Sequence, residues 1–265
     1  MKKFILILVA GSVLGSTSAN AQDFVIGARG GICIPNLSAG GSNENPLNTG
    51  YSSRFAGDGS VFAEFRFSEL FSLQAMIEYS GQGGKKDGFQ ALTTPSVLAA
   101  MYPPGQAPAY LYANYKSEAK LNYLMIPILA KFGWDLGPRS PLRIYVDAGP
   151  FAGFLMSAKQ VTSGQSELYS DAAGQQPLPG GSQSFNSTDD IKSQLNTFNF
   201  GIEGNVGLKY RFGTSAIFIE GGGNYGFLNI QKGSANGSNN TGAATANVGY
   251  SYTFREHGVK KETKK

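Results

Sequence analysis

Apolar and polar residues alternate along much of this chain with a period of two, the pattern of a β-strand with one apolar face. The clearest segment runs from 198 to 212 and exceeds the ~5–6 residues of an ordinary globular strand. Its outward positions would be Phe198, Phe200, Ile202, Val206, Leu208, Tyr210 and Phe212. A tilted membrane-crossing strand of ~9–11 residues with an extension beyond the bilayer would explain this length.

Seven further segments repeat the design, at about 24–34, 55–67, 71–80, 121–134, 142–148, 217–227 and 247–254. In the fourth strand, 121–134, both faces are apolar. We place Leu124, Ile126, Ile128 and Phe132 outward and Lys131 inward, and we expect a bulge at Pro127, which lacks the amide that a ladder needs. The prediction is an all-β fold, namely an eight-stranded antiparallel transmembrane β-barrel arranged as an up-and-down meander.

The connections between these segments alternate in length. Short turns are expected at 68–70, 135–141 and 213–215, and long polar loops at 35–54, 81–119, 159–196 and 231–242. Short turns on one side and long loops on the other are typical of outer-membrane barrels, with the short side periplasmic. We therefore expect the protein in the cell outer membrane, with lipid around the barrel.

Both ends of the chain carry processing signals. A basic start, an apolar run of about a dozen residues and Ala19-Asn20-Ala21 predict a signal peptide over residues 1–21. The barrel domain would span 22–254, and 255–265 would form a basic periplasmic tail. No second apolar segment reaches the ~18 residues of a transmembrane helix.

The last predicted strand resembles the assembly signal of bacterial outer-membrane barrels, which the barrel-assembly machinery reads during insertion. Asn247, Gly249, Tyr252 and Phe254 match its polar, glycine and two aromatic positions in order. An ordinary strand with one apolar face is the alternative interpretation.

Charge and composition narrow the classes of function. The segment 22–254 holds 15 basic and 16 acidic residues, a balance that gives no support to nucleic-acid binding. The 36 glycines and 12% aromatic residues suit strands better than helices. The one cysteine, Cys33, allows no internal disulfide and is expected to be a small residue of the barrel wall.

Charged residues of both signs fall on the inward faces of the predicted strands. An eight-stranded barrel is just wide enough for side chains to fill, so we expect a lumen charge network that closes the barrel, with a narrow gated conduit as the alternative. The members are Arg29, Glu64, Arg66, Glu78, Lys131, Arg143, Asp147, Glu203, Lys209, Arg211 and Glu220.

The sequence offers no arrangement typical of catalysis. The one histidine, His257, lies in the predicted tail, so histidine-dependent hydrolytic mechanisms lack a positioned base. One Cys and one His leave no zinc cluster. Asp189 and Asp190 are interpreted as a solvated turn or the start of a helix. We predict no enzymatic activity, no cofactor and no metal.

Three stretches are similar to the Bacteroidetes-type outer-membrane β-barrel family that includes the PorT-like group. They are 67–74 followed by 78–80, 121–127 followed by Lys131, and 148–153 followed by 157–159. Family members often carry Glu where this chain has Met125, so the family's interior network is not carried over. The resemblance implies an integral outer-membrane protein of a Gram-negative bacterium, and no single activity.

The resulting hypothesis is a non-enzymatic barrel with a mostly closed polar lumen, structural or partner-binding through its long extracellular loops. Envelope or secretion proteins are the partners considered. The alternatives are a small porin-like channel and an accessory of an outer-membrane secretion system. A soluble ligand-binding barrel would need a polar exterior, which the outward Phe, Ile and Tyr residues contradict.

Overall fold

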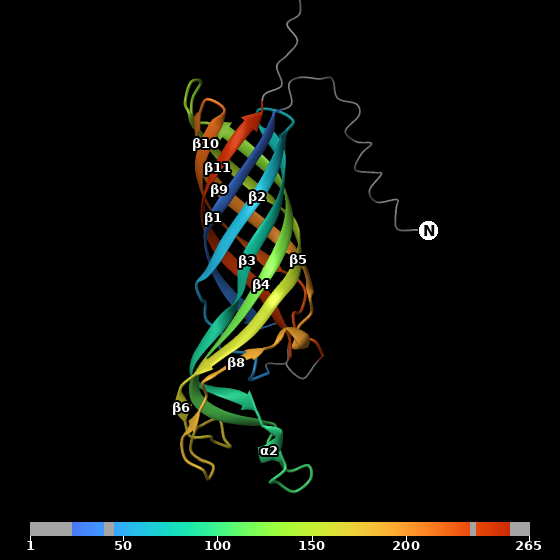
Figure 1. Ribbon diagram of the computed structural model, residues 1–265, viewed down its shortest axis with the longest axis vertical. Coiled ribbons are helices and arrows are strands. Elements are labelled where there is room, and N and C mark those ends of the chain that lie inside the picture. Colours follow the sequence, from blue (N-terminus) through green and yellow to red (C-terminus); the bar gives the residue numbers. More distant parts are fainter. Residues whose placement is uncertain (1–22, 40–44, 234–236, 255–265) are drawn as a thin grey trace, which may run out of the picture.

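Eight antiparallel strands close into a ring (Figure 1). The computed structural model describes residues 23–39, 45–233 and 237–254. The ring strands are β1 (Phe24–Ala39), β2 (Ala56–Arg66), β3 (Phe71–Thr93), β4 (Tyr110–Asp135), β5 (Leu142–Ser163), β9 (Phe198–Phe212), β10 (Ser215–Gly226) and β11 (Asn239–Phe254). Each pairs with the next, and β1 closes the ring against β11. The predicted eight-stranded meander is confirmed.

Short connections lie at one end of the ring and long ones at the other, as predicted. We call them the short-turn end and the long-loop end. At the long-loop end lie α2 (Ser96–Ala99), β6 (Gln165–Ser166), β7 (Gln183–Ser184), β8 (Ser187–Asp190) and the 3-10 helix η2 (Lys192–Gln194). Among the described residues, no helix is long and apolar enough to cross a membrane.

The two faces of each strand differ in the way that the alternation predicts. On β9, Val206 is 51% exposed on the outside, while its neighbour Asn205 is 6% exposed inside. On β11 the corresponding pair is Val248 at 63% and Asn247 at 4%. An apolar outer band around the whole ring would be unfavourable in water and is suited to lipid.

Aromatic side chains border this band at both ends. Near the short-turn end, the ring of Phe24 lies 4.9 Å from that of Phe65 and 5.9 Å from that of Phe254. Toward the long-loop end, the rings of Phe154 and Phe198 lie 5.7 Å apart. Aromatic girdles of this kind mark the two interfaces of a membrane barrel.

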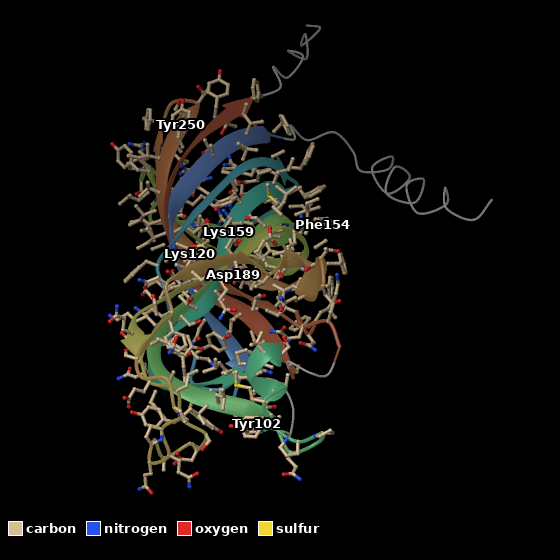
Figure 2. All side chains as sticks on the ribbon, turned by 60° about the horizontal axis from the view of Figure 1, so that its bottom comes forward. Tyr102, Lys120, Phe154, Lys159, Asp189 and Tyr250 are labelled. Atoms are coloured by element: carbon tan, nitrogen blue, oxygen red, sulfur yellow. The ribbon has the colours of Figure 1, made fainter. Side chains whose placement is uncertain are left out.

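Charged residues begin just beyond the second girdle. Lys120 on β4 and Lys159 on β5 are paired in register on the outside, and β8 passes beside them with Asp189 (Figure 2). Tyr250 lies near the short-turn end and Tyr102 at the far tip of the long-loop end. The strands beyond Lys120 and Lys159 therefore stand in water.

The strands run further than the sequence predicted. We expected long loops at 81–119 and 159–196, but β3 continues to Thr93, β4 starts at Tyr110 and β5 reaches Ser163. Figure 1 shows β3 and β4 extending past the other strands toward α2. The lipid-facing apolar band ends before this extension, although Leu111 and Ala113 on its inner face are fully buried, and the backbone ladder continues beyond the band.

The predicted bulge at Pro127 is wrong in position. Pro127 pairs in register with Phe151 on β5, and the register shifts instead between Asn122 and Tyr123, where Met156 is the extra residue of β5. On the β3 side the pairing is interrupted opposite Pro127 and resumes in the same register. The missing amide therefore removes ladder bonds without adding a residue.

Two predictions lie outside the described residues. The signal peptide at 1–21 falls in the undescribed segment 1–22, and the basic tail, with His257, falls in 255–265. Both stay predictions.

Candidate functional site within the barrel

Arg29 on β1 lies at the centre of a buried ion cluster. Its guanidinium donates hydrogen bonds to Glu78 on β3 at 2.5 Å and to Glu203 on β9 at 2.8 Å, and it also donates to Glu220 on β10. The same group reaches Ser60 on β2 at 3.0 Å. Buried charges are tolerated only when paired and hydrogen-bonded, so the closed ring and the cluster depend on each other.

A second cluster lies on the short-turn side of Arg29. The Oε2 atom of Glu64 is 3.7 Å from the ammonium groups of both Lys131 and Lys209. Lys131 is also 3.5 Å from a carboxylate oxygen of Asp147 and donates to Gln74. Two lysines therefore share one glutamate.

Tyr145 joins the two clusters. Its hydroxyl donates to Glu220 at 2.8 Å, and its ring lies 4.4 Å from the ammonium of Lys131. Asn205 makes a second link, since its amide donates to Asp147 at 2.9 Å and to Glu203 at 3.1 Å. The lumen thus contains one connected polar network.

Three of the predicted network residues lie at the edge of this centre, toward the short-turn end. Arg66, Arg143 and Arg211 lie at the short-turn mouth, where Asp135 accepts hydrogen bonds from Arg143 and Arg211, both at 2.8 Å. Arg66 binds Glu64 at 3.1 Å. Burial would raise the pKa of Asp135, but hydrogen bonds from the two arginines outweigh it and hold the pKa below its ordinary value.

The centre is consequently acid-rich, although the predicted set was nearly balanced. Its buried members are the acids Asp58, Glu64, Glu78, Asp147, Glu203 and Glu220 and the bases Arg29, Lys131 and Lys209. Asp58 was missing from the predicted network although the alternation of β2 directs it inward. Asn247, predicted only as part of the assembly signal, donates to Asp58 at 3.2 Å.

Aromatic side chains fill the lumen beside the ions by lying over glycines of the neighbouring strand. Tyr145 is directly opposite Gly207, and a Cβ built on Gly207 would lie 2.2 Å from the tyrosine ring. The same arrangement recurs three more times. The other pairs are Phe62 with Gly27, Phe151 with Gly201 and Phe218 with Gly249. Each glycine leaves room for one ring.

An apolar cluster fills the lumen toward the long-loop end. Its largest members are Tyr123 and Phe151, which are 0% and 1% exposed. Leu195 and Ile230, from the connections at that end, pack against them. A smaller apolar cluster of Phe62, Met76, Leu129, Tyr145 and Phe218 lies within the ion network. Side chains therefore fill the interior at several levels, as expected for eight strands.

The other residues considered for chemistry are Cys33, Asp189 and Asp190, and their surroundings are those of structural residues. The Sγ of Cys33 is buried and donates to the carbonyl of Gly81 at 3.0 Å. Asp189 and Asp190 lie on β8 and are exposed, and Asp190 accepts the backbone amide of Lys192 at 2.9 Å. In the described part of the chain, no group of three or more His, Cys, Asp and Glu side chains could hold a metal ion.

The predicted assembly-signal residues share the last strand but not one face. Tyr252 and Phe254 are outward, at 38% and 46% exposure, and Asn247 is inward. Gly249 is the glycine over which Phe218 lies. The role of the four residues as an assembly signal stays a prediction.

Comparison with known proteins gives low similarity to several solved barrels. Neisserial surface protein A is 14% identical (87% of this chain, 97% of that chain, TM-score 0.35). Ail, the attachment invasion locus protein of Yersinia pestis, is 10% identical (88% and 100%, TM-score 0.35). The outer membrane protease OmpT from Escherichia coli is 11% identical (91% and 99%, TM-score 0.31). A search of curated proteins finds no significant match.

The family assignment rests on a sequence match that covers most of the chain. Residues 20–232 match the model of the outer membrane protein beta-barrel domain. This match agrees with the closed meander, the apolar outer band and the asymmetric connections. The chain therefore belongs to the family of outer membrane proteins with a beta-barrel domain, and it is located in the outer membrane.

Proposed function

We propose that this protein is a non-enzymatic outer-membrane barrel with a closed lumen, which acts through its long-loop end. The observation that carries the proposal is the filling of the lumen by side chains. Tyr123, Phe151, Tyr145 and Phe218 are each at most 5% exposed, and the buried acids and bases bind one another. A water-filled passage or a substrate cleft would need some of these groups to face solvent.

Planar-bilayer conductance tests the closed lumen. Protein refolded in detergent, with folding checked by the shift in gel mobility on heating, should insert without unit conductance steps. Steps that vanish after heat unfolding would overturn the closed lumen and support the small porin-like channel. Because the central cluster is acid-rich, such a channel would prefer cations.

Exposed apolar residues at the tip of the β3–β4 extension support partner binding over a purely structural role. Val97 and Met101, in and just after α2, are 71% and 74% exposed, well beyond the outer apolar band. Exposed apolar side chains on a projecting hairpin suit contact with another protein. Envelope or secretion proteins fit this proposal, and so does the resemblance to the PorT-like group.

Photocrosslinking in cells tests the partner-binding role. A photoreactive residue replacing Val97 or Met101 should give discrete crosslinked species, and the same residue at Thr214, in a short turn, should give none from the same partner. Gene deletion distinguishes the two kinds of partner. Lost secretion of surface proteins would favour a secretion protein as the partner, and unchanged secretion would favour another envelope protein. Equal crosslinks from Thr214 and Met101, or none from either tip position, would contradict a role for the tip.

A further inference from the structure

A cavity of about 220 Å³ opens at the long-loop end, beyond the level of Lys120 and Lys159. It is bounded by β3 and β4 on one side and by the segment around Tyr51 on the other. Ser52 holds that segment against β3 by exchanging backbone hydrogen bonds with Lys85, at 2.8 and 2.9 Å. An apolar cavity of about 150 Å³ holds one benzene molecule, so this one accommodates a six-membered ring with substituents.

Lys86 supplies the charge of this cavity. Its side chain is 8% exposed, its ammonium donates to the carbonyl of Leu47 at 2.7 Å, and it lies 4.5 Å from the ring centre of Tyr51. None of the described residues that line the cavity is acidic, and Lys86 makes no ion pair within the described part of the chain. Burial lowers its pKa to about 8, so most of the ammonium is still protonated at pH 7.

The neutral polar groups of the cavity include three glutamine side chains, each anchored by one hydrogen bond to the protein. The Nε2 amide of Gln90 donates to the carbonyl of Tyr115 at 2.6 Å, and that of Gln160 donates to Ser117 at 3.0 Å. Gln231 donates to Asn239 at 3.2 Å. Each of these amides commits one hydrogen to the protein, so its Oε1 atom can accept, and its second hydrogen can donate, a hydrogen bond to a ligand.

From this geometry we infer a binding site for a sugar acid, a six-membered ring that carries hydroxyl groups and one carboxylate. The carboxylate pairs with Lys86 and the hydroxyls donate to the glutamine oxygens, while the rings of Tyr51 and Tyr115 border the cavity. One ammonium matches one carboxylate in charge, and no second lysine or arginine lines the described part of the cavity to balance a phosphate dianion. The site goes beyond the proposed function and does not depend on a closed lumen.

Calorimetric titration of the folded protein in detergent tests this inference with galacturonate and galactose as matched ligands. Galacturonate should bind at least tenfold more tightly than galactose. Lys86→Met should weaken galacturonate binding at least tenfold, and Lys86→Arg should keep it within a few-fold. Lys85→Met, which removes an exposed lysine at the next position, is the control and should bind as the wild type does.

The outcomes separate the sources of the sugar. Binding of galacturonate and also of trigalacturonate would support a site for acidic residues of a polysaccharide, and binding of the monomer alone would support a free sugar acid. Equal binding of galactose and galacturonate would overturn the inference, as would unchanged binding by folded Lys86→Met or the absence of galacturonate binding. Tighter binding of a zwitterionic amino acid would also overturn it.

Discussion

One methyl group added at Gly207 should destabilise the barrel by about 2–5 kcal/mol. The new Cβ of Gly207→Ala would lie 2.2 Å from the ring of Tyr145, which is 1% exposed and has no free direction in which to move. Overpacking of this kind costs about 1–3 kcal/mol. Displacing the ring also weakens its 2.8 Å hydrogen bond to Glu220, and a bond to a charged group contributes about 1.5–3 kcal/mol.

The same strand provides the matched control. Gly204 lies three residues earlier on β9 but faces outward, and a Cβ there would come no closer than 3.5 Å to its nearest neighbour, the carbonyl oxygen of Asp147. Gly204→Ala should therefore be neutral within about 0.5 kcal/mol, the usual range for surface substitutions away from special features. Both substitutions remove the same backbone freedom from the unfolded chain.

Urea unfolding in detergent, followed by the fluorescence of Trp134 and by gel mobility, measures both variants. The double variant Tyr145→Leu, Gly207→Ala should cost less than the sum of the two single variants, because the smaller side chain leaves room for the added methyl. Equal stability of Gly204→Ala and Gly207→Ala, or strict additivity in the double variant, would refute the ring-over-glycine argument.

Three other predictions concern charge. Arg29→Met leaves three buried carboxylates without their shared cation and should cost about 3–5 kcal/mol in urea unfolding, whereas Arg143→Met at the mouth should cost at most about 1 kcal/mol; similar values would contradict the central role of Arg29. In lipid vesicles, Val206→Arg should lower the unfolding free energy by about 2–4 kcal/mol, and Tyr210→Arg, nearer the short-turn end, by at most about 1 kcal/mol. Equal losses would contradict the membrane depths assigned to these two residues. Burial opposes the effect, but hydrogen bonds from two arginines lower the pKa of Asp135. The ionised carboxylate therefore stabilises the folded barrel above about pH 4, and this stabilisation is lost as the pH falls further. Asp135→Asn should remove this loss of stability at acid pH, and an unchanged pH profile of the unfolding free energy would refute the assignment.

The alternation of side chains was enough to predict the ring, because each strand has lipid on one face and a packed interior on the other. It failed where that contrast ends. The extension of β3 to Thr93 stays paired with β4, but its sequence lacks the regular apolar face of a membrane strand, so it was predicted to be a loop. Alternation in the sequence shows which face of a strand meets lipid and which meets the interior. Backbone pairing beyond the membrane produces no alternation, so it could not be predicted in this way.

The network was predictable residue by residue but not in its grouping. Alternation directs Arg29, Arg66 and Glu78 inward alike, yet only the register of the ring sets their depth. Depth separates the mouth arginines from the acid-rich centre. The part played by Tyr145 was not predicted because an inward aromatic residue looks like packing until its hydroxyl partner, Glu220 on β10, is known.

Because two apolar clusters at different depths close the lumen, we make a further prediction about conductance. The cluster around Phe151 lies toward the long-loop end, and the cluster around Phe218 lies within the ion network, so opening one leaves the other in place. Phe151→Ala and Phe218→Ala should each cost about 3–5 kcal/mol in unfolding, and neither should conduct in a planar bilayer. Unit steps from either folded single variant would show that one layer alone holds the barrel closed.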